Sequence, residues 1–286
     1  MKIAILGGDR REKILSELLI EKGYKVKVLS DIAFHDKDIE FYRDYKNLIK
    51  DVDILYAPLS GVDNQGFLKS SFKSEGVKVD NKLLSKVEKK TLFLIGSINT
   101  ELENILKKYN INYLETLKQP ELAIYNAIPT AEAAIKIGIE NTLFTLYGSN
   151  ILITGLGKVG MTLAWRLKAL GANVFAATRN KKAIARGRDL GIKMYDYEQL
   201  YELLSKIQIV YNTVPAQIIG ENYLKEMKKN SLIIDLASAP GGVDTESAKK
   251  YGIRNIFAPG LPGKTAPESA AEILAEMLEN IISEHF

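Results

Sequence analysis

The sequence predicts an α/β protein with two α/β domains, of which the second is a Rossmann domain built on a doubly wound parallel sheet. Short apolar runs alternate with segments of helical spacing up to residue 117, and the same alternation restarts at residue 150. A glycine-rich turn follows the first strand of the second series and opens a helix. A chain of 286 residues also has the length of about two domains of ordinary size.

The first domain is expected to span residues 1–127. A helix with Ile14, Leu15, Leu18 and Leu19 on one face should follow its first strand and end at Gly23. Strands that alternate with such helices form a parallel sheet with crossover connections. Apolar runs closed by small or polar residues indicate these strands at residues 2–6, 24–29, 53–59, 91–95 and 112–117.

The second domain is expected to span residues 128–286, and a linker helix should join it to the first. Pro129 can open this helix, because proline is tolerated in a first turn, and Gly148 is placed to end it. An apolar stripe in residues 267–282 indicates an amphipathic helix that packs back on the body of the protein or on a partner. Strands are indicated at residues 150–154, 173–178, 207–213, 231–237 and 255–258.

Composition narrows the possible classes of function. The chain has no cysteine, which excludes disulfides, thiolate catalysis and cysteine-ligated metals and fits a reducing cytoplasm; we expect no metal site. No stretch reaches the ~20 apolar residues of a membrane span, and the apolar start is too short for a signal peptide. The net charge of +4 arises from 39 basic residues scattered among 35 acidic ones. Neither nucleic acid nor a membrane is therefore an expected partner.

The glycine-rich turn is the strongest functional signal. Gly155 allows a tight turn, Gly157 lets the backbone approach a pyrophosphate, and Gly160 lets the helix pack closely on the strand. The N–H groups at the start of the helix would then face the phosphates. The loop predicted to bind a nicotinamide dinucleotide consists of Gly155, Leu156, Gly157, Lys158, Val159 and Gly160.

The end of the next strand favours NADP over NAD. A site specific for NAD usually carries Asp or Glu there, which binds the ribose hydroxyl and would repel a 2′-phosphate. This chain instead has Thr178 and Arg179, followed by Lys181 and Lys182. Cations at that place attract the phosphate, although Arg179 could also be an ordinary solvated arginine.

The turn at residues 7–9 resembles a second dinucleotide loop, but Asp9 and Glu12 stand where that loop needs glycine. A carboxylate beside a pyrophosphate is unfavourable, so no dinucleotide is expected in the first domain. Asp9 is better placed to cap the following helix. Arg10 and Arg11 either face the cleft between the domains and bind a substrate carboxylate, or only start the helix.

Ligands of doubly wound sheets lie beyond the C-terminal ends of the strands. The residues expected beside the cofactor at these ends, in addition to the loop, are Thr178, Arg179, Asn212, Thr213, Pro215 and Ala237. The residues that could bind substrate are Ser60, Asn99 and Lys264, with Arg10 and Arg11. Glu132 and Asp235 are the candidate proton acceptors, although Glu132 could only favour the dipole of the linker helix and Asp235 could only order its turn.

Taken together, these segments resemble the family of dipicolinate synthase A subunits of spore-forming bacteria. The resemblance covers essentially the whole chain and is strongest from Ile124 onward. The segments that carry it are GGDR at residues 7–10, IYNAIPTAE at 124–132, the dinucleotide loop, DLASAPGG at 235–242 and APGLPGKTAP at 258–267.

The resemblance implies a 2-hydroxyacid dehydrogenase-like layout and NADP-dependent oxidation of a dihydro- or tetrahydrodipicolinate ring to dipicolinate during sporulation, at a branch of the lysine pathway. It also implies a small dicarboxylate substrate and, as partner, the flavoprotein-like B subunit of dipicolinate synthase, and we expect a homo-oligomer. Aromatisation needs loss of a hydride to nicotinamide and of a ring proton, so a weak base such as Glu132, Asp235 or water suffices.

Two other functions stay open. One is another NADP-dependent dehydrogenase of the 2-hydroxyacid or shikimate type. Those enzymes normally carry a His–acid or Lys–Asp pair, and this chain has only His35 and His285. The other is a non-catalytic dinucleotide-binding protein that regulates a partner enzyme. Turnover by the purified chain separates these possibilities.

Overall fold

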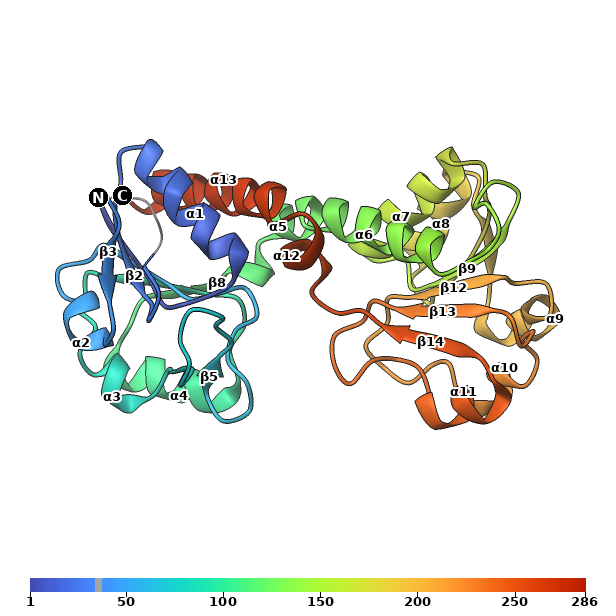
Figure 1. Cartoon of the computed structure of the whole chain (residues 1–286), viewed down its shortest axis with the longest axis horizontal. Coiled ribbons are helices and arrows are strands. Elements are labelled where there is room, and N and C mark those ends of the chain that lie inside the picture. The colour runs from blue at the N-terminus through green and yellow to red at the C-terminus, as the bar shows by residue number, and fades with distance from the viewer. Residues whose placement is uncertain (34–37) are drawn as a thin grey trace. The chain divides into compact units, whose positions relative to one another are not determined.

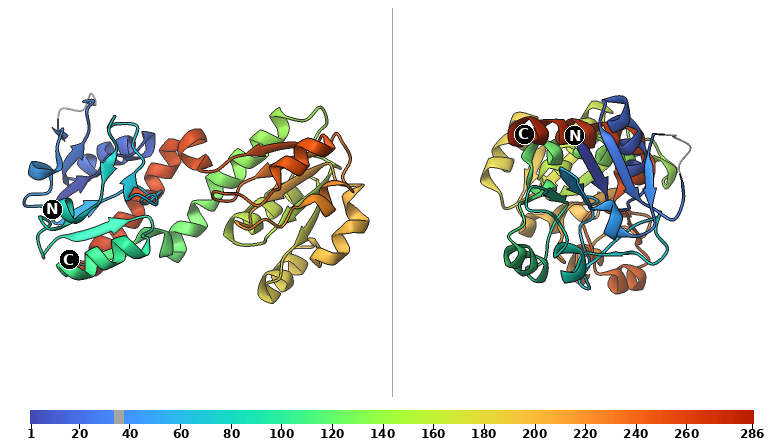
Figure 2. Two further views of the ribbon diagram at one scale, coloured as in Figure 1. Left: turned by 90° about the horizontal axis from the view of Figure 1, so that it is seen from below. Right: turned by 90° about the vertical axis from the view of Figure 1, so that its left-hand side faces the viewer.

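A computed structural model describes residues 1–33 and 38–286, so His35 lies outside the described residues. The chain forms two compact units (Figure 1). The first consists of Met1–Ala123 together with Pro267–Phe286, and the second of Ile124–Ala266. Both termini therefore belong to the first unit (Figure 2). The predicted division into residues 1–127 and 128–286 differs from this one, because it assigns the C-terminal helix to the second domain.

Within the described residues of the first unit, eight strands form the sheets: β1 (Lys2–Ile5), β2 (Lys25–Leu29), β3 (Glu40–Tyr42), β4 (Ile54–Tyr56), β5 (Phe67–Leu68), β6 (Val77–Lys78), β7 (Leu92–Ile95) and β8 (Tyr113–Glu115). Six of them make a parallel sheet with the order β3-β2-β1-β4-β7-β8. The other two, β5 and β6, form a small antiparallel ribbon between β4 and β7 in the chain.

The helices of the first unit are α1 (Arg10–Glu21), α2 (Tyr45–Leu48), α3 (Asn81–Leu84), α4 (Thr100–Tyr109), the 3₁₀ turn η1 (Thr116–Lys118) and α13 (Pro267–His285). The amphipathic C-terminal helix predicted from the sequence is confirmed as α13. It lies beside α1 (Figure 1), where Leu274 and Leu278 share one apolar core with Leu15 and Leu19. The burial of these leucine side chains stabilises the packing of the C-terminal helix α13 against the N-terminal helix α1.

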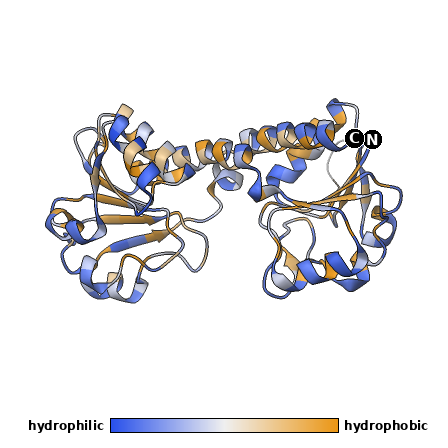
Figure 3. Ribbon diagram, turned by 180° about the vertical axis from the view of Figure 1, so that it is seen from behind, coloured by the Kyte–Doolittle hydropathy of each residue, from blue (hydrophilic) through white to orange (hydrophobic). Residues whose placement is uncertain are grey.

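The second unit contains a second six-stranded parallel sheet, with β9 (Asn150–Thr154), β10 (Asn173–Ala177), β11 (Lys193–Tyr195), β12 (Ile209–Asn212), β13 (Leu232–Asp235) and β14 (Arg254–Phe257). Its order is β11-β10-β9-β12-β13-β14, which repeats the order of the first sheet. The central strands of both sheets are apolar and buried (Figure 3). This is the Rossmann arrangement, in which ligands bind where the strand order reverses; in this sheet that point lies between β9 and β12. The predicted fold class is confirmed.

The helices around the second sheet are α6 (Ala127–Glu140), α7 (Lys158–Ala169), α8 (Lys181–Asp189), η2 (Tyr197–Leu200), α9 (Tyr201–Leu204), α10 (Glu221–Leu224), α11 (Thr245–Tyr251) and α12 (Leu261–Thr265); α5 (Pro120–Tyr125) spans the boundary of the two units. Helix α6 packs against α7 and approaches the sheet closely at Gly138. A Cβ atom at Gly138 would lie 2.2 Å from the Tyr211 hydroxyl oxygen, so this approach requires glycine.

The linker helix ends earlier than expected. Its predicted stop at Gly148 is wrong, because α6 ends at Glu140. The side-chain amide of Asn141 donates to the Ile137 carbonyl at 2.8 Å, and the Thr142 hydroxyl donates to the Gly138 carbonyl at 2.8 Å. These two bonds satisfy carbonyl groups of the last turn, which otherwise lack partners.

Candidate functional site

The loop between β9 and α7 has the geometry that its glycines predict. Gly155 adopts a φ of +84°, a conformation that favours glycine. A Cβ atom at Gly160 would lie 2.0 Å from the Gly155 carbonyl oxygen, so the first turn of α7 presses directly on the loop. Both positions are therefore restricted to glycine by the fold itself.

Gly157 differs from these two glycines. It precedes α7 with a φ of −74°, which other residues also adopt, and a Cβ atom built on it meets no described atom within 4 Å. Within residues 1–33 and 38–286, no side chain caps this helix N-terminus. The first N–H groups of α7 therefore face open space, which is the environment that a pyrophosphate occupies in this fold. The loop fits a dinucleotide.

The end of β10 carries the residues predicted to distinguish NADP from NAD. Thr178 is buried, and its hydroxyl oxygen accepts from the Asn180 backbone N–H at 3.3 Å. Arg179 is exposed, and its guanidinium carbon lies 5.6 Å from the centre of the Tyr197 ring. No local pattern in the sequence points to Tyr197, because the pairing of β10 with β11 is what brings it beside Arg179.

Asn212 and Thr213, at the end of β12, hold the loops together. The Asn212 amide oxygen accepts from the Thr154 hydroxyl at 2.8 Å, and its nitrogen donates to Asp235 Oδ1 at 2.7 Å. The Thr213 hydroxyl lies 3.0 and 3.1 Å from the carbonyl oxygens of Thr154 and Gly155. Both side chains are thus committed to protein partners, whereas Pro215 is exposed. Asn212 and Thr213 therefore position the dinucleotide loop through hydrogen bonds that link the ends of neighbouring strands.

Asp235 is 2% exposed and accepts three hydrogen bonds. Its Oδ1 accepts from the Asn212 side chain and from the Ala237 backbone N–H at 3.2 Å, and its Oδ2 accepts from the Gly242 N–H at 2.8 Å. Ala237 is itself buried at the start of the loop. This pattern gives Asp235 the loop-ordering role that the sequence left open beside a catalytic one.

Replacing Asp235 by asparagine should destabilise the second unit by roughly 1–3 kcal/mol, because an amide NH₂ would face an N–H donor and leave it unpaired. Urea unfolding followed by circular dichroism and by the fluorescence of Trp165, which lies in α7, measures the change. The matched control is Asp189→Asn, since Asp189 is exposed and only pairs with Arg186. Equal stability of the two variants would contradict the role of Asp235.

Glu132 and Lys264 also belong to the second unit. The Glu132 side chain is 65% exposed and lies 3.7 Å from the Arg166 guanidinium of α7. Lys264 is exposed and donates to the Pro259 carbonyl at 3.0 Å. The segment around it forms the helix α12, because Pro262 fits the first helical turn.

Within the described residues, two of the substrate-binding candidates in the first unit, Arg10 and Arg11, differ in whether the guanidinium already binds a carboxylate. Arg10 is exposed. Arg11 instead closes on Asp9 through two hydrogen bonds, from Nε to Oδ1 at 3.0 Å and from Nη2 to Oδ2 at 2.9 Å. Of the two roles left open for Arg11, this geometry favours the one at the start of the helix, because its guanidinium fork already holds a carboxylate.

Ser60 and Asn99 also follow strands of the first sheet. Ser60 is exposed after β4. Asn99 caps α4, since its Oδ1 accepts from the Leu102 N–H at 2.8 Å and its Nδ2 donates to the Asp63 carbonyl at 3.3 Å. Asn99 thus has a structural role that explains its position without a ligand.

The turn at residues 7–9 is closed by its own side chains. Asp9 accepts from the Arg11 N–H at 2.9 Å, and Glu12 Oε2 accepts from the Asp9 N–H at 2.8 Å, so the two residues form a capping box. The predicted cap by Asp9 is confirmed. Glu12 is fully buried, and burial raises its pKa to about 7.

The stability of the first unit should depend on pH through Glu12. The pKa of about 7 lies above the ordinary 4.5, so the folded chain binds this proton more tightly and loses stability as pH rises through about 5 to 7. Glu12→Gln keeps the capping box but has no proton to release. The variant should therefore gain on the wild type by up to about 1.4 kcal/mol per pH unit in that window.

Urea unfolding at a series of pH values, followed by circular dichroism, measures this difference. Glu21→Gln, at the exposed end of the same helix, is the control and should show no such trend. A stability difference between Glu12→Gln and the wild type that stays constant with pH would contradict the burial of an ionisable carboxyl at this position.

Two further classes of feature are absent from the described part of the chain. Residues 1–33 and 38–286 contain no group of three or more His, Asp or Glu side chains that could hold a metal ion. Among the same residues, none of the helices combines the length and the apolar character that crossing a membrane requires.

The chain is similar to known proteins over nearly its whole length. Residues 2–117 match the family model of the N-terminal domain of the dipicolinate synthase A subunit. Residues 122–247 match the model of the D-isomer specific 2-hydroxyacid dehydrogenase, NAD binding domain. The dipicolinate synthase A subunit of Bacillus subtilis (strain 168) is 34% identical over 289 residues, which cover 99% of this chain and 96% of that protein.

Solved structures show the same similarity. The dipicolinate synthase A subunit from Bacillus halodurans has a TM-score of 0.89 at 32% identity, covering 98% of this chain and 97% of that chain. The corresponding protein from Bacillus subtilis has a TM-score of 0.90 at 33% identity, covering 100% and 96%. A transhydrogenase from Sinorhizobium meliloti shares the fold, with a TM-score of 0.68 at 16% identity over 98% of this chain and 93% of that chain.

Proposed function

Because the chain belongs to the family of dipicolinate synthase A subunits, we propose that it oxidises a dihydro- or tetrahydrodipicolinate ring to dipicolinate with NADP as hydride acceptor. The chain is an oxidoreductase of the dehydrogenase type with a domain that binds a nicotinamide dinucleotide. The observation that carries the proposal is the open N-terminus of α7 behind Gly157, which offers free N–H groups to a pyrophosphate.

The charge at the end of β10 supports NADP as the cofactor. Arg179 is exposed there, Lys181 and Lys182 open the following helix, and residues 176–182 contain no carboxylate. A 2′-phosphate would gain charge-assisted hydrogen bonds from these groups. The ribose hydroxyl of NAD would lack the carboxylate that usually binds it.

The chemistry divides between the cofactor and this chain. When bound, oxidised NADP accepts the hydride that leaves the ring, and a dihydro ring becomes aromatic when it also loses one proton. A tetrahydro ring would need two such oxidations. The chain has to hold a dicarboxylate, for which Arg10 is the better candidate of the two N-terminal arginines because Arg11 is paired with Asp9.

The proton acceptor that we propose is Glu132. Of the two candidate carboxylates, Glu132 is exposed to solvent. Asp235 is buried, and its oxygens already accept three hydrogen bonds. A general base must reach the proton that it removes. An accessible carboxylate meets that requirement, and a buried one with every oxygen occupied does not.

The proposed function also includes a partner, because the relatives are named as one subunit of a synthase. The deciding experiment supplies the ring precursor and NADP to the purified chain with and without the flavoprotein-like B subunit, and to the B subunit alone. Formation of dipicolinate together with reduced nicotinamide supports the proposal. Failure of the chain to form product in both reactions would contradict it, and product formation by the B subunit alone would indicate a regulatory role for this chain.

Replacing Arg179 by aspartate should weaken NADP binding about tenfold or more, far more than it weakens NAD binding. The arginine charge pairs only with the 2′-phosphate, and a charge-assisted hydrogen bond of this kind is worth about 1.5–3 kcal/mol. Titration of the variant with each cofactor measures the discrimination. Arg188→Asp, near the end of α8, is the matched control. Unchanged discrimination in Arg179→Asp would remove Arg179 from this role.

A further inference from the structure

Arg179 and Tyr197 follow two neighbouring strands of the second sheet, β10 and β11. Strands β10 and β11 run parallel, with Ala177 opposite Tyr195. The segments that follow them therefore both begin at the carboxyl edge of the sheet, where dinucleotides bind in this fold. The Arg179 guanidinium carbon then lies 5.6 Å from the centre of the Tyr197 ring. This distance is within the range of an attractive cation–π contact.

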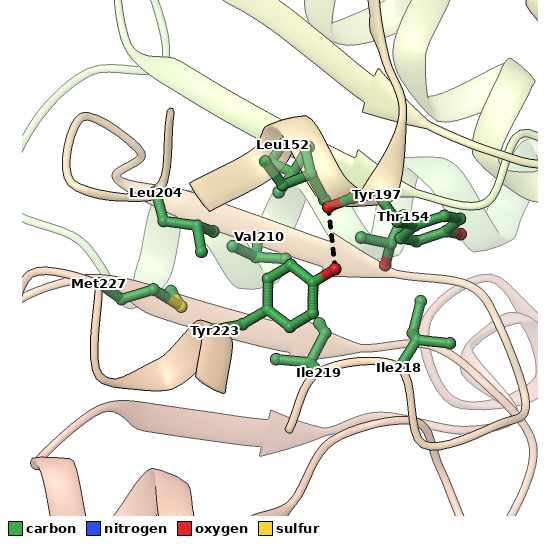
Figure 4. A pocket seen from close by; sticks show the side chains of 10 residues that line it. Leu152, Thr154, Tyr197, Leu204, Val210, Ile218, Ile219, Tyr223 and Met227 are labelled. Carbon is green, nitrogen blue, oxygen red and sulfur yellow. Dashed lines mark hydrogen bonds between the residues drawn. The ribbon is translucent and has the colours of Figure 1, made fainter. Parts of the chain in front are cut away.

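Tyr197 is fixed from behind. The Tyr223 hydroxyl donates to the Tyr197 carbonyl at 2.9 Å (Figure 4), and the Asp196–Gln199 capping box starts the 3₁₀ turn η2 at Tyr197. The Tyr197 ring also helps to line an apolar cavity of about 10 Å³, together with Leu152 and Ile218. That volume holds about one water molecule, so the cavity is no ligand site.

Electrostatics agree with this contact. Burial raises the pKa of the Tyr197 phenol above its ordinary value, and the nearby positive charge of Arg179 opposes that rise. The arginine is exposed, so without the ring its long side chain would sample many rotamers. A guanidinium that is held in place before the ligand arrives loses less conformational entropy when it binds a phosphate.

We propose that Tyr197 is a positioning residue for cofactor choice, which holds the Arg179 guanidinium where it meets the 2′-phosphate of NADP. The proposal rests on the proposed NADP function and adds a residue to it. The aromatic face of Tyr197 is the active feature, and its hydroxyl is not required. Tyr197 therefore acts mainly on NADP binding, because NAD lacks the 2′-phosphate that pairs with Arg179.

The test measures the dissociation constants of NADP and NAD for Tyr197→Leu, Tyr197→Met and Tyr197→Phe. The leucine and methionine variants should bind NADP about three- to fivefold more weakly, which is the size of a cation–π contact at an exposed site. Their affinity for NAD should stay within about twofold of the wild type, and the phenylalanine variant should behave as the wild type does towards both cofactors. Methionine keeps the apolar cavity filled if leucine impairs folding.

Two further comparisons separate positioning from a general structural effect. Tyr201→Leu removes a neighbouring aromatic ring, which stacks on the Tyr223 ring with 4.8 Å between the ring centres. This variant should leave the ratio of NADP affinity to NAD affinity unchanged. In an Arg179→Leu background, Tyr197→Leu should cause no further loss of NADP affinity, because the two residues act together.

The outcomes distinguish this inference from the proposed function. A wild-type chain without preference for NADP would overturn the proposed cofactor and the role of Tyr197 with it. A wild type that prefers NADP while Tyr197→Leu and Tyr197→Met keep the full preference would overturn the role of Tyr197 alone. Equal loss of NADP and NAD affinity would also overturn it, since that result indicates a merely structural residue.

Discussion

Gly157→Ala is expected to weaken dinucleotide binding about a hundredfold while the protein keeps its fold and its thermal stability. The φ of −74° at Gly157 suits alanine, and a Cβ atom there meets no described atom within 4 Å. The added methyl group therefore causes no steric clash in the folded chain. It fills the space before the first N–H groups of α7, where a pyrophosphate would bind. Titration with NADP and NAD, beside a thermal melt, measures both effects.

Gly220→Ala is the matched control for this prediction. Gly220 also precedes a helix and has a φ of −98°, and a Cβ atom added to it would meet no described atom within 4 Å, yet it lies outside the dinucleotide loop. Gly160→Ala should behave in the opposite way and lose stability, because its Cβ would lie 2.0 Å from the Gly155 carbonyl oxygen. Wild-type affinity in Gly157→Ala would show that the cofactor does not approach this helix.

The two sheets show why local sequence predicts binding in one unit and not in the other. Both have the same strand order, and in both a glycine turn follows the first strand. In the first unit, Asp9 and Glu12 occupy the N–H groups of the turn and the start of α1. In the second unit, Gly157 leaves the start of α7 open. The difference lies in residues next to each other in the chain, so it could be predicted from the sequence.

Other features depend on partners that are distant in the chain. The pairing of strands joins Asn212 to Asp235, and it also brings Arg179 beside Tyr197. The amphipathic pattern of α13 predicted a helix, but not that α1 is its partner, because a stripe of leucines fits any apolar surface. Helix α6 ends before Gly148, because the side chains of Asn141 and Thr142 bind carbonyl groups of its last turn.

The substrate-binding candidates were the least predictable. An arginine or asparagine after a strand can face a ligand or satisfy the backbone nearby, and the sequence alone does not distinguish these roles. Arg11 and Asn99 proved to have protein partners, whereas Arg10 and Ser60 are exposed. Local hydrogen bonds of short polar side chains compete with ligand binding, so only the folded geometry separates the two roles.

Glu132→Gln is expected to lower product formation about a hundredfold or more, the usual effect of losing a general base, while NADP affinity stays unchanged. Glutamine keeps the shape of the side chain but cannot accept the ring proton at neutral pH. Glu132 is exposed on α6, and within the described residues the ion pair that it would lose is the contact with Arg166 at 3.7 Å. An exposed pair of this kind contributes little stability, so the variant should fold normally.

The matched control is Glu140→Gln, which removes a carboxylate from the same helix. Glu140 is exposed and lies 3.7 Å from Lys136, so its loss breaks a comparable ion pair without removing the proposed base. Turnover should therefore fall in Glu132→Gln and stay at the wild-type rate in Glu140→Gln. Titration with NADP should give the same affinity for both variants. A Glu132→Gln variant within a few-fold of the wild-type rate would contradict the assignment. Water would then be the base that best fits the chemistry, because Asp235 has its oxygens occupied by the Asn212 side chain and by the backbone of its own loop.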